Sequence, residues 1–559
     1  MKNILKYTIT SVAIAFAMSS CDDYFNVLPK DEVVLENFYT EEADLISVLY
    51  SCYSALETPD CIGRMAVWGE FRSENFTVST SSNAEITKIM DENIMPTTIY
   101  SDWSDFYVVI NRCNTVIHYA PIVNERDPNF TISEMRASIA EAKAIRALCY
   151  FYLIRAFRDV PFVTEPSIDD TRDFQVPVTS FDSILNYLVQ DLEPVKNHAV
   201  RKFAVKDYNV TRFTRFAIYA LLAELHLWNK EYDAAIENCN LVIDYKKQLY
   251  EEELSRVGSN IDIDLFNGVP LYSEHPVGAP TKSGNASSKI FGTQRSFESI
   301  FELNFMNNQS VTNSFVSSFY GSSNNDVGGV SVTPFLYENA YTTSGNAVFK
   351  NTDCRYLASI IKKDPEYGVG KYTRTVNTFD NPTSSMTTAP TVASTKRNNS
   401  FSNWILYRLS DMLLIKAEAS LMLNKSSRTQ QLEAFRWVAP TYNRANNKLG
   451  TTDTLKFDAY ADGEGLAMEN LILLERHREF LFEGKRWFDL LRYARLKGNN
   501  DIIVNNAIKK QKSNTAAIKV KLSSLDGIYF PYAETELEVN LKLKQNPAYI
   551  VDESVSVSQ

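Results

Sequence analysis

Two helical segments joined by a short polar turn, within residues 214–244, most restrict the folds open to this chain. Small residues recur at helical spacing along the first segment, which runs to Trp228, and the second begins at Tyr232. Small side chains let two helices approach closely, while large aromatic side chains fill the gaps between them. The positions that carry this pattern are Ala217, Ala220, Ala223, Tyr232, Ala235 and Cys239.

This alternation of alanine and bulky residues resembles the tetratricopeptide repeat, in which helix pairs stack on one another. Apolar residues also recur every three or four positions in other segments, one of which is expected to end at Pro161 and another to break at Gly484. We predict a mainly α fold, a tetratricopeptide-like scaffold of about four helix pairs forming a single large domain. The further helical segments are 132–157, 181–195, 404–424 and 469–495.

Long irregular stretches separate these helices. Residues from about 255 to 350, and again from 377 to 400, are rich in Ser, Asn, Gly and Thr with scattered aromatics. Compact domains rarely carry such long loops unless the loops bind something. The aromatics favour folded loops over disorder, because disordered tracts are poor in aromatic residues. We therefore expect these two insertions to build a ligand-binding face on the helical scaffold.

The first 21 residues have the character of an export signal. Two lysines precede a run of about 12 apolar or small residues, too short to span a bilayer, and Cys21 follows two serines. This ending resembles the lipobox of bacterial lipoproteins, although Met18 is a less usual residue there. We expect residues 1–20 to be a signal peptide, residues 21–559 the mature domain, and Cys21 to carry acyl chains that anchor it. An ordinary signal peptide with a chance cysteine is the alternative.

Charge and cysteine content exclude some classes. The net charge is −11, and it becomes −13 when residues 1–20, with their two lysines, are removed. An acidic chain without a basic cluster argues against nucleic-acid binding, which depends on Lys and Arg. The six cysteines beyond Cys21 match neither a dense disulfide framework nor a zinc pattern. Cys52 and Cys61 are close enough in sequence to pair, and buried thiols are the alternative.

Motifs of common enzymes are absent from the sequence. His477 has no second histidine four residues on, and neither a nucleophile elbow nor a phosphate-binding glycine loop occurs. A glycosidase carboxylate pair needs no motif, so the sequence alone leaves that alternative open. We expect Glu475 and Glu479 to form ion pairs with nearby basic residues instead. These are Arg476, Arg478, Lys485 and Arg486.

Several motifs, in order along nearly the whole chain, resemble the SusD/RagB family of Bacteroidetes outer-membrane lipoproteins. The most specific is the stretch from Arg478 to Leu490, within "ERHREFLFEGKRWFDLLRY". Two places depart from the family pattern: Pro531-Tyr532-Ala533 stands for Pro-Ile-Pro, and Asp353-Cys354-Arg355 for Asp-Pro-Arg. The other matching segments are "WGEFRSEN", "WSDFYVVINRCN", "EAKAIRALCYFYLIRAFRDVPFV", "ALLAELHLWNKEYDAAIE", "YRLSDMLLIKAEA" and "GIYFPYAETELEVNLKLKQNPAY".

The resemblance implies a surface-exposed lipoprotein that captures a nutrient, in most members a glycan. It also implies a SusC-like TonB-dependent transporter as partner, over which the protein closes as a lid, with no catalysis and no cofactor. The acidic pair Asp22 and Asp23 resembles the surface-export signal of these bacteria. A peptide-binding member of the family, and a helical-repeat scaffold that assembles other surface proteins, remain as alternatives.

A sugar-binding surface needs exposed aromatic rings beside polar groups, on loops held by a rigid scaffold. Trp103 has a second interpretation as a core anchor, and Arg72 as a buried structural arginine. The identity of the glycan or peptide stays open. The candidate ligand-binding residues are Trp68, Arg72, Asn75, Tyr100 and Trp103 near the first helices, and Phe319, Tyr320, Tyr337 and Tyr341 in the polar insertion.

Overall fold

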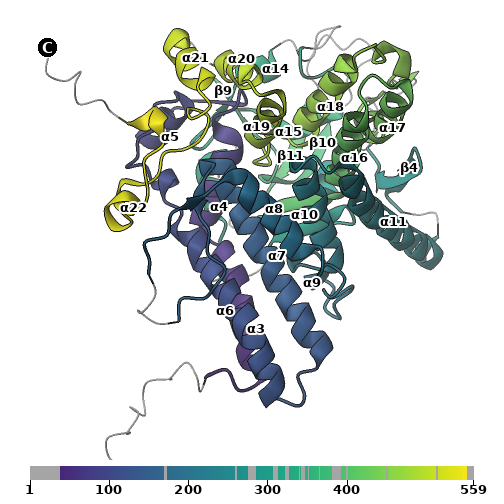
Figure 1. Ribbon diagram of the computed structural model, residues 1–559. Coiled ribbons are helices and arrows are strands. Elements are labelled where there is room, and N and C mark those ends of the chain that lie inside the picture. The colour runs from purple at the N-terminus through teal and green to yellow at the C-terminus, as the bar shows by residue number, and fades with distance from the viewer. Residues whose placement is uncertain are drawn as a thin grey trace, which may run out of the picture.

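The computed structural model is mainly helical, and long helices dominate it (Figure 1). Among the residues that the structure describes, no helix is both long and apolar enough to cross a membrane. The predicted signal peptide, Cys21 and Tyr341 lie outside these residues. The described residues are 38–168, 173–258, 261–274, 285–305, 312–321, 327–338, 340, 346–350, 352–363, 365–379, 392–397, 401–448, 451–452, 454–510 and 514–550.

The long helices pack in sequence order, each against the next, through α3, α6, α7, α8, α10, α11, α16, α17 and α18. Short connections bring consecutive helices back alongside one another, as the three residues between α10 and α11 do. This arrangement confirms the predicted scaffold of paired helices. The long helices are α3 (Glu42–Leu56), α6 (Ser104–Arg126), α7 (Ile132–Phe157), α8 (Phe181–Leu192), α10 (Arg215–Trp228), α11 (Tyr232–Val257), α16 (Leu409–Leu423), α17 (Arg428–Ala445), α18 (Leu466–Glu479) and α19 (Arg486–Lys497).

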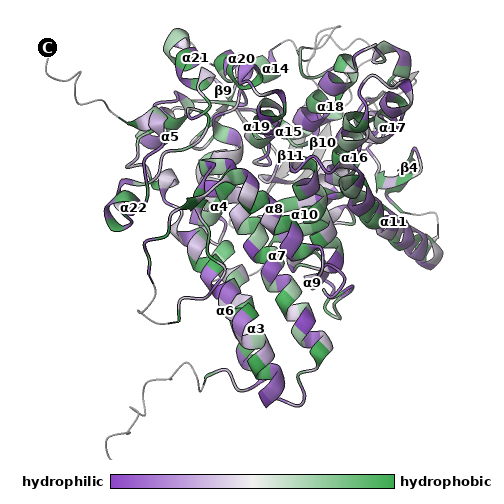
Figure 2. Cartoon of the chain, viewed as in Figure 1, coloured by the Kyte–Doolittle hydropathy of each residue, from purple (hydrophilic) through white to green (hydrophobic). Residues whose placement is uncertain are grey.

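Local sequence explains where these helices begin and how they pair. Thr214 caps α10 by accepting a hydrogen bond from the backbone N–H of Ala217. The small side chains of α10 are buried, and the Phe216 ring stacks on Tyr245 of α11 with 3.5 Å between centroids. The outer end of α11 is hydrophilic and exposed (Figure 2), since it extends beyond the packed helices.

The predicted start of one helical segment, 404–424, is wrong. Residues 404–408 form a strand, β12, because this aromatic and β-branched run pairs with β6 and is buried on both faces. The helix α16 starts only at Leu409, where the Asp411 carboxylate accepts the backbone N–H of Arg408. Helix α7 spans Ile132–Phe157 as predicted, and it ends ahead of Pro161 because Arg158 takes a positive φ of 71°.

Short elements fill the loop-rich regions, so the described parts of 255–350 are folded as expected. The strands pair antiparallel as β1 with β7, β2 with β3, β4 with β5, β6 with β12, β8 with β9, β10 with β11 and β13 with β14. The strands are β1 (Phe76–Thr77), β2 (Val160–Pro161), β3 (Val178–Thr179), β4 (Ile263–Phe266), β5 (Val269–Tyr272), β6 (Ser299–Leu303), β7 (Ser331–Val332), β8 (Ile360–Lys363), β9 (Glu366–Val369), β10 (Arg374–Phe379), β11 (Val392–Lys396), β12 (Trp404–Arg408), β13 (Asn447–Lys448) and β14 (Thr451–Thr452). The short helices are α4 (Pro59–Ala66), η1 (Val67–Phe71), α5 (Ala84–Met90), η2 (Ile99–Ser101), α9 (Tyr208–Thr211), α12 (Asn285–Ser287), η3 (Ser288–Thr293), α13 (Ser314–Tyr320), α14 (Pro334–Tyr337), α15 (Cys354–Ser359), η5 (Phe457–Ala459), α20 (Asp501–Ala507), η6 (Ile508–Lys510), α21 (Thr515–Ser523), α22 (Glu534–Val539) and η7 (Pro547–Tyr549).

A buried ionic network joins segments far apart in sequence. Glu479 accepts hydrogen bonds from Arg355, Arg408 and Arg444, and all four side chains are buried. Glu475 pairs with Arg355 at 2.7 Å and with Arg478 at 3.5 Å. Of the ion pairs predicted for Glu475 and Glu479 with nearby basic residues, the structure therefore contains only Glu475 with Arg478. The other predicted partners bind elsewhere: Arg476 to Asp489, Lys485 to Asp411 and Arg486 to Glu74.

The cysteines in the described part of the chain are free and buried, so the possible Cys52–Cys61 disulfide is not formed. Each of these two thiols instead donates to a backbone carbonyl, of Val48 and Ala55 respectively. Burial raises the pKa of the Cys61 thiol to about 12, which keeps it protonated and unreactive at neutral pH.

Candidate functional site

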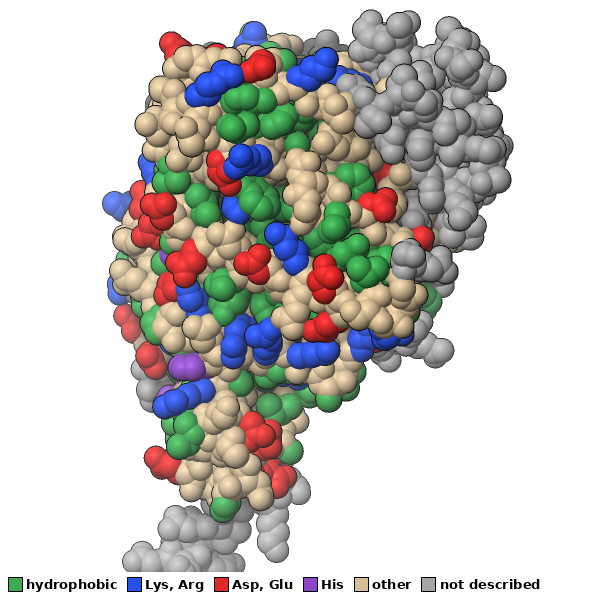
Figure 3. Space-filling view, turned by 90° about the vertical axis from the view of Figure 1, so that its right-hand side faces the viewer, with side chains coloured by type: hydrophobic (Ala, Val, Ile, Leu, Met, Phe, Trp, Pro, Cys, Tyr) green, Lys and Arg blue, Asp and Glu red, His purple; other side chains and the backbone are tan. Residues whose placement is uncertain are grey.

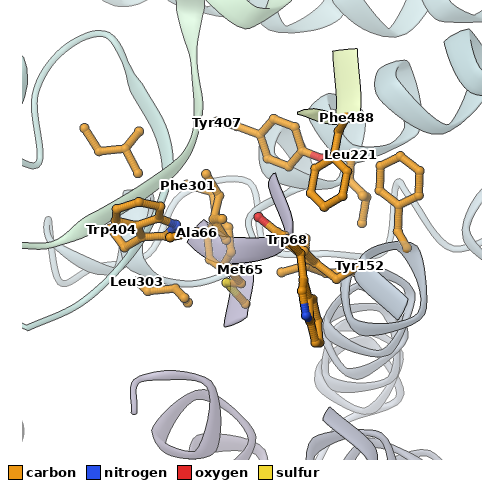
Figure 4. Close-up of a cluster of buried hydrophobic side chains, with 14 of the residues drawn as sticks. Met65, Ala66, Trp68, Tyr152, Leu221, Phe301, Leu303, Trp404, Tyr407 and Phe488 are labelled. Atoms are coloured by element: carbon orange, nitrogen blue, oxygen red, sulfur yellow. The ribbon is translucent and has the colours of Figure 1, made fainter. Parts of the chain in front are cut away.

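Most of the candidate ligand-binding residues near the first helices lie in the protein core. The prediction that these side chains contact a ligand is therefore corrected. Trp68 has no exposed surface and belongs to the buried hydrophobic cluster shown in Figure 4. Its ring packs against Phe106 and Phe157, with 5.0 and 5.3 Å between ring centroids. Its indole N–H donates to the carbonyl of Tyr100 at 2.8 Å. Trp68 therefore anchors the fold around η1 and presents no face to a ligand.

Arg72 and Asn75 are likewise fully buried structural residues. Arg72 forms an ion pair with Glu92 at 2.6 Å, and its guanidinium lies 4.4 Å from the centre of the Trp487 ring. The Asn75 side chain donates to Glu70 at 2.6 Å and contacts His477 Nε2 at 2.6 Å. Since their polar groups are satisfied inside the protein, neither can bind a ligand in this conformation.

Tyr100, Trp103 and Tyr320 are also buried. The Tyr320 hydroxyl donates to the carbonyl of Phe482 at 3.1 Å, and its ring packs against Phe315. The polar residues around Tyr320 in sequence suggested exposure, but α13 turns this ring inward. Trp103 packs on aromatic neighbours while forming one wall of a groove.

Phe319 and Tyr337 are the remaining described candidates, and both are half-buried. Phe319 packs edge-on against Phe71 at 5.6 Å, so it serves the core. Tyr337 stacks on Tyr367, with 3.7 Å between ring centroids and 11° between ring planes. Both rings of this tyrosine pair keep part of their surface in solvent.

Backbone contacts hold the tyrosine pair in place. Tyr337 ends α14, whose Leu336 is buried and whose N-cap residue Thr333 donates to the carbonyl of Glu74 at 2.8 Å. The Asn346 amide donates to the carbonyl of Leu336, also at 2.8 Å, and secures the other side of the helix. Tyr367 belongs to the β8–β9 hairpin. The pair is thus built on two braced elements and does not depend on a free loop.

A polar loop, residues 78–83, borders the tyrosine pair. The Ser79 and Ser82 hydroxyls donate to the carbonyls of Gly328 and Gly329, each at 2.7 Å. Glu366, next to Tyr367, accepts hydrogen bonds from both the backbone N–H and the hydroxyl of Thr80 at 3.1 Å. Flat aromatic rings beside hydroxyl and carboxylate groups suit a ligand with apolar faces and polar rims.

Tyr367 was missed by the sequence analysis. It follows an Asp-Pro turn between two short apolar runs, and such a turn is a hairpin signal. The hairpin would have placed Tyr367 at a turn on the surface, but no sequence feature indicated that it pairs with Tyr337.

No metal site is found among the residues that the structure describes. No group of three His, Cys, Asp or Glu side chains among them is placed to hold a metal ion. His477 is buried, and burial together with Arg486 holds its pKa well below the usual 6.5. On the face seen in Figure 3, basic and acidic side chains are interspersed, so no single-sign patch is formed there.

Comparison with known proteins identifies the class. The sequence model described as "SusD family" matches residues 297–549, and the one described as "Starch-binding associating with outer membrane" matches residues 32–227. Together the two matches cover most of the chain and show that it is a SusD-like protein, and the description of the second model associates such proteins with the outer membrane.

Individual relatives agree with this assignment over most of the chain. SusD-like protein P38 of Formosa agariphila is 25% identical over 516 residues, which cover 88% of this chain and 92% of that protein. A SusD superfamily structure from Bacteroides vulgatus matches with a TM-score of 0.64 at 16% identity, over 91% of this chain and 100% of that one. A putative sugar binding protein from the same species matches with a TM-score of 0.60 at 19% identity, over 93% and 100%.

Proposed function

We propose that this protein captures a glycan at the bacterial surface and passes it to a TonB-dependent transporter in the outer membrane. Membership of the SusD family, and the starch-binding description of the model that matches residues 32–227, support a glycan ligand. The single observation that carries the proposed site is the stacked, partly exposed pair of Tyr337 and Tyr367. Lipid attachment at Cys21 and a SusC-like partner complete the proposal.

The tyrosine pair has the chemistry that a sugar needs. The C–H face of a pyranose ring is apolar and covers an aromatic ring, while its hydroxyls require polar partners at the edge. Glu366, next to Tyr367 in β9, and Thr80, which is hydrogen-bonded to Glu366, supply such groups near the pair. Each ring that becomes fully buried contributes on the order of 1.5–3 kcal/mol before the cost of ordering the ligand. Because the aromatic pair is braced, little of that gain is lost in fixing the site.

Substituting the tyrosine pair is expected to weaken glycan binding without unfolding the protein. We expect Tyr337→Ala and Tyr367→Ala each to lower the affinity about tenfold, which corresponds to about 1.4 kcal/mol. The measurement is calorimetry or affinity electrophoresis against a panel of polysaccharides and peptides. Tyr50→Ala serves as the matched control, since Tyr50 is an exposed tyrosine on α3.

The outcomes separate function from site. If the native protein binds no glycan in the panel, the proposed function is wrong, and binding of peptides alone would support a peptide-capturing member of the family. If a glycan binds but the double variant Tyr337→Ala/Tyr367→Ala retains full affinity, the function stands and the assigned site is wrong.

A further inference from the structure

A groove away from the tyrosine pair runs between α6, α22 and the segments 161–167 and 174–176. It consists of two adjoining cavities of about 320 and 390 Å³, which share Trp103, Tyr107, Asn111 and Glu536 as walls. Helices α6 and α22 both lie on the left of the molecule in Figure 1, whereas α14 with Tyr337 lies at the top. We call this feature the α6–α22 groove.

Exposed apolar side chains gather around the α6–α22 groove. Phe174 and Val539, which line it, are 60% and 67% exposed, and Leu541 beside them is 81% exposed. Met95 and Ile99, also exposed, adjoin α22, because Glu534 N–H donates to the carbonyl of Pro96. Exposed apolar side chains gathered at the rim of a groove are typical of an interaction surface.

The walls of the groove are built and braced. The Gln175 amide donates to the carbonyl of Val539 at 2.7 Å and accepts the backbone N–H of Leu541 at 2.8 Å. The Asn540 amide donates to the carbonyl of Val176 at 2.8 Å. The segment that carries Phe174 is thereby fixed to α22, so the opening between them is a formed feature.

Most polar groups in the groove are already satisfied within the protein. The Tyr107 hydroxyl donates to the carbonyl of Pro161 at 2.6 Å, and Asn111 accepts the backbone N–H of Ser167 at 2.7 Å. Asn114 donates to the carbonyls of Val163 and Glu165 at 3.2 Å and accepts from Arg146. A sugar would find few groups here to form hydrogen bonds with its hydroxyls, whereas an apolar side chain needs no hydrogen-bond partner.

Glu536 gives the groove its charge. Its half-buried carboxylate accepts a hydrogen bond from Trp103, and burial, with the nearby Asp102, raises its pKa. Glu534 and Glu538 on the same helix are exposed, while Arg112 at the far end donates to the carbonyl of Ser51. The apolar groove thus has an acidic edge, which favours a positively charged occupant.

We infer that the α6–α22 groove docks a peptide segment of a partner protein, which inserts an apolar side chain between α6 and α22 and places a Lys or Arg against Glu536. The apolar residue gains by burial in the cavity, and the cation neutralises a carboxylate that is partly removed from water. This binding would be separate from glycan capture, because the tyrosine pair is no part of the groove.

The test uses the full-length mature protein and the fluorescein-labelled peptide acetyl-Lys-Ala-Phe-Ala-Lys-amide, with fluorescence anisotropy as readout. We expect Val539→Arg and Phe174→Ala to weaken binding at least tenfold. Glu536→Gln is expected to weaken binding of this peptide about threefold or more. The same variant is expected to bind a neutral analogue, in which Ser replaces both lysines, as tightly as the native protein does. Leu265→Arg, at a similarly exposed leucine on β4, is the control and is expected to bind as the native protein does.

Four results would overturn the inference. The first is no binding of the peptide, and the second is equal binding of its counterpart with Glu in place of both lysines. The third is displacement of the peptide by maltose or glucose, which would make the groove a sugar site. The fourth is a dimer, seen by light scattering, that Val539→Arg dissociates, which would make a second copy of the chain the occupant.

Discussion

The Gly69→Ala variant is expected to lose several kcal/mol of folding stability or to fail to fold. Gly69 lies in η1, where the chain passes against the turn at Gly484. A Cβ at this position would lie 1.8 Å from the Gly484 carbonyl oxygen and 2.6 Å from its carbon. Both are backbone atoms, so no side chain can move aside. Because ordinary overpacking costs about 1–3 kcal/mol, we expect a loss of roughly 3 kcal/mol or more.

The measurement for Gly69→Ala is urea unfolding followed by circular dichroism. Gly463→Ala is the matched control, because its Cβ would meet open space and its φ is not positive. A Gly69→Ala protein whose free energy of unfolding lies within about 1 kcal/mol of the native value would contradict the close packing of η1 on this turn.

The Glu479→Gln variant is expected to be destabilised by about 3–5 kcal/mol, the usual cost of breaking a buried ion pair. The Glu479 carboxylate accepts hydrogen bonds from Arg408 at 2.6 Å, from Arg355 at 2.9 Å and from Arg444. Glutamine keeps the shape but removes the charge, so the positive charge of three arginines is no longer balanced by Glu479. An i,i+3 pair on the surface, Glu253 with Arg256, provides the control variant Glu253→Gln, which is expected to be neutral.

The same carboxylate gives a pH dependence with a definite sign. Burial alone would raise the pKa of Glu479, but Arg444, Arg408 and Arg355 hold it well below the usual 4.5. Because the pKa of Glu479 is lower in the folded than in the unfolded protein, its carboxylate contributes its full stabilisation at pH values above the unfolded-state pKa. This contribution is lost as the pH falls below about 4.5. The native protein should therefore lose stability more steeply than Glu479→Gln in urea unfolding between pH 6 and pH 3. Parallel curves for the two proteins would contradict this role.

The helical scaffold could be predicted because its signal is local. Alanines and aromatics at spacings of three and four mark a buried helix face wherever the helix packs, and α10 and α11 begin where the sequence predicted. The strand β12 could not be separated from the following helix in this way. A short run of buried apolar residues fits either structure, and its partner β6 lies about 100 residues earlier.

The binding residues were harder to predict because burial depends on distant contacts. Arg72 begins a short polar stretch and Trp68 stands just before it, but Glu92, Trp487 and Phe157 enclose them in space. Tyr337 could be selected as an aromatic in a polar insertion, whereas its stacking on Tyr367 depends on a hairpin 30 residues later. Composition drew attention to Tyr337 inside a polar insertion, but Tyr367 lies outside both insertions, and composition could not indicate which rings meet.

The most direct test of glycan capture by the tyrosine pair is a crystal structure with the tightest-binding oligosaccharide from the panel. The account predicts a sugar ring within about 4 Å of the Tyr337 or Tyr367 ring, with its hydroxyls toward Thr80 and Glu366. An oligosaccharide bound at full occupancy elsewhere on the protein, with both tyrosine rings left in solvent, would contradict it.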